Sequence, residues 1–296
     1  MGLDHFNGEL RECEPAHFPD VFSEAETSTL CSPELLADLL MPNSAATASI
    51  DIYANEYLVR LPDMLHKSDR LAVEVIAEQL QQGATIRFRN LERCNTKLNA
   101  LTLAIDRLFH CTSDINAYLT PAHSDGFPPH FDNTDVLVVQ LMGVKQWHLY
   151  PEYSNRMELP LKDTPWDADK YRPSGTIQHR ELHPGDVLYI PRGGMHSAAC
   201  KNDLSLHLTI SLDTETRVDQ LSRLMLTWAE HEASARRRLP DRPDAARGAL
   251  LQAAQDFYRW LQDNVDLPSY NTPVETLETD RQKVQDKFRQ ALGAIR

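Results

Sequence analysis

Two histidines and one aspartate in this chain have the types and spacing of a metal site. His130 and Asp132 are separated by one residue, and His196 follows a pair of glycines further along. Two imidazoles and a carboxylate on one face of an ion form the ligand set of non-haem Fe(II) oxygenases, which leaves positions for a co-substrate and dioxygen. Alternate residues of an extended strand point the same way, so His130 and Asp132 can hold one ion while Phe131 packs on the opposite side. We therefore predict an iron site with His196 as the third ligand.

Two further tripeptides have a similar pattern, but their surroundings differ. They are His123-Ser124-Asp125 and His179-Arg180-Glu181. His130-Phe131-Asp132 leads into residues 136–141, an apolar and β-branched run that predicts a buried strand. The segment 121–129 around His123 instead has the composition of a turn. We expect only the motif beside the buried strand to be held rigidly in a core.

The elements that would position these residues are short strands. Residues 136–142 predict a buried strand, residues 145–150 predict its return partner, and residues 187–190 predict another strand shortly before His196. Residues 151–177 contain several prolines and predict a long loop or insert. Such a succession of strands and turns is typical of a barrel or sandwich, which we place over residues 113–212.

The last predicted strand, residues 205–212, alternates strictly between polar and apolar side chains. Its polar set is His207, Thr209 and Ser211. A polar stripe opposite an apolar one usually faces solvent. In a barrel with a catalytic lumen, the polar stripe can instead line the site. The pattern leaves both arrangements open.

Residues 1–112 predict a mixed α/β segment that supports the barrel. Ser32 has the features of a helix N-cap, and Ser68 and Asp69 open a predicted helix that ends at Gly83. Residues 85–89 then alternate as a strand does, and apolar residues at helical spacing follow from Leu98 to Leu108.

Residues 213–296 predict a helical region with three apolar stripes. The stripes comprise Leu221, Leu224, Met225 and Trp228, then Leu250, Ala254, Phe257, Tyr258 and Leu261, and then Val284, Phe288, Leu292 and Ile295. Their aromatic content exceeds what the covering of one barrel face needs, and exposed apolar patches often mark an interface. We therefore expect a homodimer.

Charge and hydropathy limit the partners. The chain has 30 Lys and Arg against 43 Asp and Glu, which gives a formal net charge of −13. This charge argues against nucleic acid, whose binding needs a basic patch, and it favours a basic protein or peptide. No apolar run approaches the roughly 18 residues of a membrane span, and the polar N-terminus lacks a signal-peptide layout. We expect a cytoplasmic protein without a membrane partner.

Five ordered motifs resemble the JmjC cupin oxygenases. They lie at residues 116–121, 126–132, 140–147, 184–193 and 205–211. The resemblance spans roughly residues 15–230 and is greatest to the ribosomal oxygenases, which hydroxylate ribosomal proteins. It implies an α+β fold whose core is a double-stranded β-helix, or jelly roll, over residues 113–212.

The resemblance also implies the cofactors and the residues that hold them. By motif position, His130, Asp132 and His196 are the ligands of Fe(II), and Lys145 pairs with the distal carboxylate of 2-oxoglutarate. A buried lysine needs an anionic partner, whereas the alternative is an exposed lysine in a hairpin. The other matched positions are Asn116, Thr209 and Tyr118 near the co-substrate, with Tyr118 and Ser211 also near the substrate.

The implied reaction is hydroxylation of an unactivated C–H bond, in which dioxygen and 2-oxoglutarate give succinate and carbon dioxide. A side chain of a protein or peptide is the first expected substrate, and a free amino acid or a biosynthetic small molecule or peptide is the alternative. Two other classes remain: a non-catalytic cupin that binds a ligand or partner, and a dimeric scaffold with a vestigial metal site. The complete triad favours an enzyme over the non-catalytic cupin. The family continues with helices and a winged-helix domain, and too few residues follow here for a full winged helix.

Overall fold

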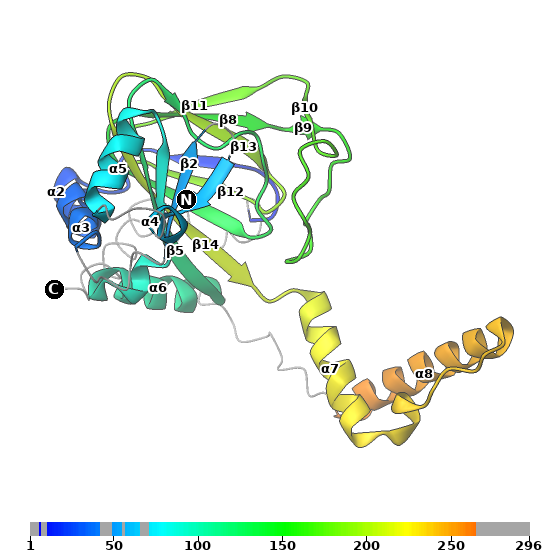
Figure 1. The fold of residues 1–296 in the computed structure, drawn as a ribbon. Coiled ribbons are helices and arrows are strands. Elements are labelled where there is room, and N and C mark those ends of the chain that lie inside the picture. Colours follow the sequence, from blue (N-terminus) through cyan, green and yellow to red (C-terminus); the bar gives the residue numbers. More distant parts are fainter. Residues whose placement is uncertain (1–5, 7–10, 42–48, 55–56, 66–70, 265–296) are drawn as a thin grey trace. The chain divides into compact units, whose positions relative to one another are not determined.

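The computed structural model describes residue 6 and residues 11–41, 49–54, 57–65 and 71–264 (Figure 1). The chain divides into two compact units, and within the described residues the first ends at Thr214 and the second begins at Glu215.

Two antiparallel sheets form the first unit. The large sheet has the strand order β1-β12-β7-β14-β5-β4-β2-β3, the small sheet has the order β11-β8-β13-β6, and β9 pairs with β10. The strands are β1 (Ala16–Phe18), β2 (Ile50–Ala54), β3 (Tyr57–Arg60), β4 (Thr85–Phe88), β5 (Cys111–Thr120), β6 (Ser124–Asp125), β7 (Asp135–Met142), β8 (Lys145–Tyr150), β9 (Glu152–Tyr153), β10 (Pro173–Ser174), β11 (Gln178–Leu182), β12 (Val187–Ile190), β13 (Met195–Cys200) and β14 (Ser205–Thr214). The predicted α+β class and the predicted barrel strands are confirmed.

The two faces of β14 separate the interior of the barrel from the helical layer. Leu206, Leu208 and Ile210 are fully buried in the large hydrophobic cluster that also contains residues of the helices. His207 and Thr209 point to the other face and line a cavity. The polar stripe of β14 therefore faces the lumen at these two positions, which decides between the two arrangements that the sequence left open.

Helices cover one face of the large sheet. They are α2 (Glu24–Leu30), α3 (Pro33–Asp38), α4 (Leu61–Leu65), α5 (Ala72–Gln81) and α6 (Thr96–Phe109), and most of them gather on one side of the barrel in Figure 1. Ser32 caps α3 as predicted, because its hydroxyl accepts a hydrogen bond from the backbone N–H of Leu35. Ser68 and Asp69, the predicted start of α5, lie outside the described residues.

Strands from the N-terminal segment extend the barrel sheet. β4 is the strand predicted at residues 85–89, and it pairs with β5. β2 and β3 continue the sheet beyond β4, and β1 pairs with β12 at the opposite edge. The sequence analysis did not predict these three short strands.

The second unit is helical. It contains α7 (Arg217–His231), a short 3-10 helix (Ala233–Arg236) and α8 (Pro243–Asn264). Trp228 of α7 packs against Phe257 of α8, with ring centroids 5.4 Å apart. These helices contain the first two predicted stripes, whereas Val284, Phe288, Leu292 and Ile295 lie outside the described residues. No described helix combines the length and the apolar character that membrane crossing requires.

Candidate metal centre

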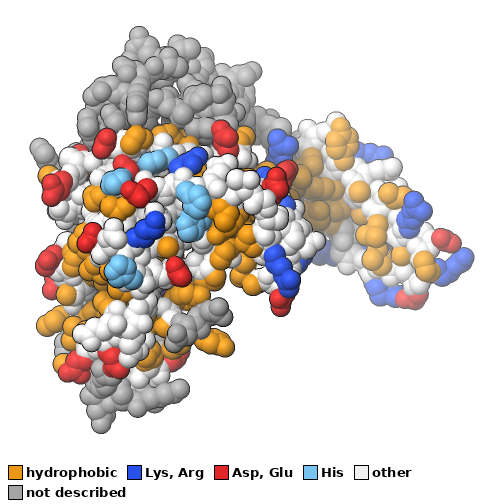
Figure 2. All heavy atoms as spheres, turned by 90° about the horizontal axis from the view of Figure 1, so that it is seen from above, with side chains coloured by type: hydrophobic (Ala, Val, Ile, Leu, Met, Phe, Trp, Pro, Cys, Tyr) orange, Lys and Arg blue, Asp and Glu red, His pale blue; other side chains and the backbone are white. Residues whose placement is uncertain are grey.

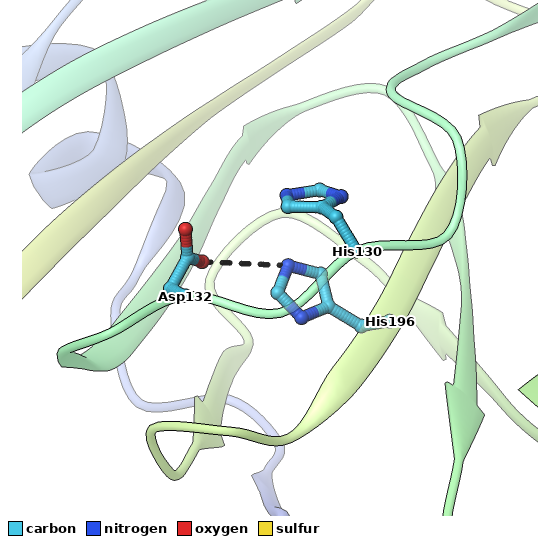
Figure 3. A group of neighbouring side chains, drawn as sticks. All are labelled: His130, Asp132 and His196. Carbon is cyan, nitrogen blue, oxygen red and sulfur yellow. Dashed lines mark ion pairs between the residues drawn. The ribbon is translucent and has the colours of Figure 1, made fainter. Parts of the chain in front are cut away.

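His130, Asp132 and His196 come together as predicted (Figure 3). Their potential ligand atoms all lie within 4.8 Å of one another, and no other group of three such side chains occurs among the described residues. Nε2 of His196 lies 3.6 Å from Oδ2 of Asp132. The imidazole centroids of His130 and His196 are 4.5 Å apart. Two imidazoles and one carboxylate therefore face a common point.

The backbone that carries the ligands differs from the prediction in one respect. His130 was expected on a regular strand, but it forms an isolated bridge with His196, and Asp132 lies in the irregular segment before β7. The two histidines exchange backbone hydrogen bonds of 3.0 and 2.7 Å, and the amide of Gly193 donates to the carbonyl of Asp132. These bonds attach the ligand segment to the backbone around His196, and Gly193 has a φ of +78° that favours glycine.

Phe131 packs away from the metal ligands, as the alternation predicts. It is buried in an aromatic cluster with Tyr153 and Tyr171, whose ring centroids lie 6.0 and 4.9 Å away. Trp166 from the same long loop lies edge-on to Phe131 at 5.2 Å. The predicted insert at residues 151–177 therefore supports the loop that carries two of the three ligands.

Each histidine is oriented by a carbonyl group two residues before it in the chain. Nδ1 of His130 lies 2.7 Å from the carbonyl oxygen of Pro128, and Nδ1 of His196 lies 2.9 Å from that of Gly194. A carbonyl oxygen only accepts, so both Nδ1 atoms carry the proton and both Nε2 atoms keep a lone pair for a metal. The sequence analysis did not identify these two carbonyl groups.

The environment keeps the deepest ligand neutral. Burial and the neighbouring His130 lower the pKa of His196 to about 4, although Asp132 and the Gly194 carbonyl oppose the shift. His196 is therefore unprotonated at neutral pH, as a metal ligand must be. The side chain of Asp132 remains 40% exposed whereas that of His196 is 6% exposed, so the cluster opens towards solvent on one side.

A cavity of about 150 Å³ adjoins the cluster. Its lining comprises Arg87, Tyr118, Gly126, Phe127, His130, Asp132, Val136, Val138, Lys145, Trp147, His196, Ala198, His207 and Thr209. Asp132 is the only carboxylate in this lining, which also contains a lysine, an arginine and an indole. The cavity therefore suits an anionic ligand next to the metal site.

Lys145 is a buried lysine that lines this cavity, so the alternative of an exposed lysine in a hairpin is wrong. Its ammonium donates to the hydroxyl of Thr120 at 2.8 Å and lies 3.5 Å from Nδ1 of His207. Among the residues that the structure describes, no carboxylate pairs with it. Burial lowers the pKa of Lys145 to about 7, with a small opposing effect from Cys200.

Tyr118 and Thr209 line the cavity, whereas Asn116 and Ser211 do not. The side chain of Asn116 accepts from the amide of Asn90 and donates to Asp114. Ser211 faces Asp114 in the register between β14 and β5. The structure thus places these two residues further along the same strands, outside the cavity that Lys145 and the triad share.

Arg87 is a cavity residue that the sequence analysis passed over. Its guanidinium bonds to buried Asp51 at 2.7 and 3.1 Å and lies over the ring of Phe127, 5.6 Å from the centroid. It also bonds to Tyr118, whose pKa is raised to about 12 because burial outweighs the effect of Arg87. The strand pattern of residues 85–89 indicated alternation, but it gave no sign that Arg87 faces a site.

The other two His-x-acid motifs are not part of the cluster. His123 has a φ of +57° in a turn, and Asp125 lies on the short edge strand β6. His179 packs edge-on against His148 of the neighbouring strand, with ring centroids 4.9 Å apart. The prediction that only the 130–132 motif contributes to the site is consistent with these positions.

A family model and a solved structure are similar to this chain. Residues 91–220 match the family model described as the JmjC domain. The two-sheet architecture resembles the X-ray structure of Escherichia coli YcfD, with a TM-score of 0.52 at 16% identity over 99% of this chain and 68% of that chain. Residues 91–220 are therefore similar to the JmjC domain, and the fold of this chain is similar to that of YcfD.

Among curated proteins, it is related to the proteins named bifunctional lysine-specific demethylase and histidyl-hydroxylase NO66. The Drosophila persimilis protein is 33% identical over 195 residues, which cover 62% of this chain and 26% of that protein. The Dictyostelium discoideum protein is 30% identical over 177 residues, which cover 59% of this chain and 34% of that protein. The match thus spans about a quarter to a third of the length of these two relatives.

Proposed function

We propose that this protein is an Fe(II)- and 2-oxoglutarate-dependent oxygenase that hydroxylates a C–H bond of an amino-acid side chain in a protein or peptide. One observation carries the proposal: a cluster of two histidines and a carboxylate shares one cavity with a buried lysine that has no carboxylate partner among the described residues. The first feature suits the metal, and the second suits a dianionic co-substrate.

The residues present fit Fe(II). Imidazole and carboxylate groups suit this ion, and three protein ligands leave open positions. Both Nε2 atoms are free of protons because both Nδ1–H groups donate to carbonyl oxygens. His130, Asp132 and His196 would hold the ion. A YcfD structure of similar fold, with a TM-score of 0.50 and 14% identity, contains cobalt and succinic acid, which supports a metal next to a dicarboxylate.

The residues present also fit 2-oxoglutarate. Lys145 is an ammonium donor in an enclosed site, and an anion would offset the cost of its burial. Gly126 lies beside Lys145, and a Cβ there would come within 2.8 Å of the Ala198 carbonyl oxygen and 3.8 Å of Nζ of Lys145. Thr209 and Tyr118 line the same cavity.

The chemistry divides between the bound groups and the protein. Bound Fe(II) and 2-oxoglutarate couple decarboxylation, which gives succinate and carbon dioxide, to the insertion of one oxygen atom from dioxygen into a C–H bond. The protein would fix the ligand geometry through the two carbonyl-anchored histidines. Lys145 would hold the distal end of the co-substrate, and the apolar walls at Val136 and Val138 would exclude water.

The relatives support a polypeptide substrate. NO66 is named for two activities, lysine-specific demethylation and histidyl hydroxylation, and YcfD is described as a ribosomal oxygenase. The formal net charge of −13 favours a basic substrate. Acidic and basic side chains are nevertheless interspersed on the face seen in Figure 2, so this face has no single acidic field.

We also propose that the protein forms a homodimer through its helical unit. Several large apolar side chains of α7 and α8 are exposed in the single chain: Val218, Leu221, Met225, Leu226, Leu250, Leu251 and Tyr258. Within the described part of this unit, Trp228 is the only buried residue. An apolar surface of this kind is typical of an interface between copies.

The proposed activity can be tested before the substrate is identified. The Fe(II) protein is incubated aerobically with 2-oxoglutarate and host proteins, succinate is measured, and the host proteins are digested and analysed by mass spectrometry for peptides that gain one oxygen atom. The Asp132→Ala protein is the matched control. We expect succinate and an oxidised peptide with the wild-type protein alone. If the iron-loaded wild-type protein forms neither product, the proposal is wrong.

A further inference from the structure

His207 lies between the metal ligands and Lys145 without an assigned role. It belongs to β14, is 3% exposed, and lines the cavity. The ring of Tyr118 stacks on it in parallel, with centroids 4.9 Å apart and an interplanar angle of 3°. Trp147 meets it edge-on at 5.4 Å. These two neighbours fix the plane of the imidazole.

The neighbouring lysine determines which ring nitrogen carries the proton. Nδ1 of His207 is 3.5 Å from Nζ of Lys145, and an ammonium group has donors only. When Lys145 is protonated, Nδ1 therefore presents its lone pair to it. Burial and the adjacent Lys145 keep the pKa of His207 well below its ordinary value, so the ring is neutral. A neutral ring with a lone pair on Nδ1 carries its proton on Nε2.

The Nε2–H group of His207 is then a donor without a protein acceptor in the described part of the chain. Among the residues that the structure describes, the one hydrogen-bond partner of this ring is Lys145, which contacts Nδ1. Trp147, two residues after Lys145 on β8, has an indole Nε1 that is buried without an acceptor in the described part of the chain. Buried donors are nearly always satisfied. An excess of donors around the lysine is the pattern expected where an anion binds.

We propose that Nε2–H of His207 donates a hydrogen bond to the carboxylate of 2-oxoglutarate that Lys145 neutralises. His207 would thus be a co-substrate-binding residue, held in the correct tautomer by the same lysine. This inference rests on the proposed function, because it assumes that 2-oxoglutarate occupies the cavity. The alternative is that His207 only positions Lys145 and does not itself contact the co-substrate. The test must distinguish these two roles.

Three substitutions distinguish the two ring nitrogens. In His207→Gln, the amide group reaches the position of Nε2 and can still donate to the carboxylate. In His207→Asn, the shorter amide replaces Nδ1 and keeps only the contact with Lys145. His207→Phe keeps a ring for Tyr118 to stack on but has neither nitrogen. His148→Gln, a substitution of a half-buried histidine outside this cavity, is the matched control.

The measurement is the dissociation constant of 2-oxoglutarate for each Fe(II) protein, obtained by calorimetry under argon. We expect His207→Phe and His207→Asn to weaken binding by about ten- to hundredfold, which is the loss of one hydrogen bond to a charged group. His207→Gln and the control should stay within about threefold of wild type. The affinity for Fe(II) alone should not change in any variant. Long-range ¹H–¹⁵N spectra of the wild-type protein should show the proton of His207 on Nε2.

The outcomes separate the inference from the proposed function. If the wild-type protein does not bind 2-oxoglutarate, the proposed function fails. If it binds, and His207→Phe binds equally well, the inference is wrong. It is also wrong if His207→Asn keeps the affinity, or if His207→Gln loses it as His207→Phe does, because Nε2–H would then have no part in binding. If the His207→Phe protein does not fold, the affinities of His207→Asn and His207→Gln still show whether Nε2–H binds the co-substrate.

Discussion

At the residue scale, the proposed metal site consists of three side chains, with two carbonyl groups that select the tautomers of the histidines. Pro128 and Gly194 each precede a ligand histidine by two residues, and each accepts the Nδ1 proton. This arrangement directs both Nε2 lone pairs towards Asp132. Burial and the neighbouring His130 keep the pKa of His196 well below its ordinary value, so this side chain is neutral at physiological pH.

The first prediction concerns the ligands themselves. His130→Ala, Asp132→Ala or His196→Ala should each abolish succinate formation, since two remaining protein ligands hold Fe(II) weakly. The fold should survive, because Asp132 is partly exposed and the large hydrophobic cluster does not include these residues. Activity assays and circular dichroism check the two statements. His123→Ala is the control and should keep full activity; the assignment is wrong if Asp132→Ala does so.

The second prediction concerns Lys145. Lys145→Ala would leave the distal carboxylate of 2-oxoglutarate buried and unpaired, at a cost of about 3 to 5 kcal/mol. The affinity for 2-oxoglutarate should then fall at least about a hundredfold, with little change in Fe(II) binding. Lys145→Arg should retain part of the affinity, because a guanidinium can also receive a carboxylate. Calorimetry measures both; an unchanged affinity in Lys145→Ala would show that the co-substrate binds elsewhere.

The third prediction follows from the lowered pKa of Lys145, about 7 in the ligand-free protein. The anion binds the charged ammonium, so below pH 7 the lysine is already protonated and the affinity is highest. Above pH 7 a proton must first be taken up, so the dissociation constant should rise by about tenfold per pH unit. In Lys145→Arg this rise should disappear, because the guanidinium stays charged. A flat profile in the wild-type protein would contradict the prediction.

The sequence predicted the residues of the triad but only part of their surroundings. His130 and Asp132 were recognisable because two ligands one residue apart form a local pattern beside a buried strand. His207, Arg87 and Trp147 gave no comparable signal, because each reaches the cavity through strand pairing over long sequence distances. His207 is an example. The alternation of residues 205–212 placed it on the polar face of a strand, but only the pairing of β14 with β5 and β7 shows that this face lies inside the barrel.

At the element scale, the long loop after β8 supports the metal site. Its residues Tyr153, Trp166 and Tyr171 pack around Phe131, which lies between two ligands. Asn133, next to Asp132, donates to the carbonyl oxygens of Lys162 and Thr164 in the same loop. The prolines of this segment predicted a long loop or insert, and the structure adds the short paired strands β9 and β10 within it. Composition could not show that the segment contributes to a core, because aromatic contacts depend on the tertiary fold.

The fourth prediction tests this support. Phe131→Ala should lower the free energy of unfolding by about 3 to 5 kcal/mol, the usual cost of removing a buried aromatic ring. It should also weaken Fe(II) binding, because the ligands on either side lose their fixed direction. Denaturant titration and metal titration measure the two effects, and Phe131→Leu should show smaller losses in both. If stability falls while the affinity for iron stays unchanged, the cluster does not orient the ligands.

At the scale of the whole molecule, the barrel unit and the helical unit have different surfaces. The barrel unit buries two layers of apolar side chains around the sheets. The helical unit buries one residue within its described part and exposes side chains such as Leu226 at 68% and Tyr258 at 61%. Helical periodicity predicted these helices because it is a local property. What covers their apolar faces could not be predicted in the same way, because it depends on contacts with residues far away in the sequence or in a second copy.

The fifth prediction is that the protein is a homodimer in solution. The exposed apolar residues of α7 and α8 would be covered by a second copy. Light scattering at micromolar concentration should give twice the chain mass of 33.7 kDa. Leu226→Glu should favour the monomer, whereas Leu103→Glu, which alters an exposed leucine of α6, should leave the dimer intact. A wild-type monomer at this concentration would rule out the proposed interface.

Whether one cavity holds both Fe(II) and 2-oxoglutarate can be decided by an anaerobic titration. 2-Oxoglutarate is added to the Fe(II) protein under argon while the visible spectrum is recorded. We expect a weak charge-transfer band that saturates at one equivalent of co-substrate in the wild-type protein. The band should be absent in Asp132→Ala and should require far more 2-oxoglutarate in Lys145→Ala. An iron-loaded wild-type protein that shows neither the band nor bound 2-oxoglutarate would contradict the assignment of this cavity to the two cofactors.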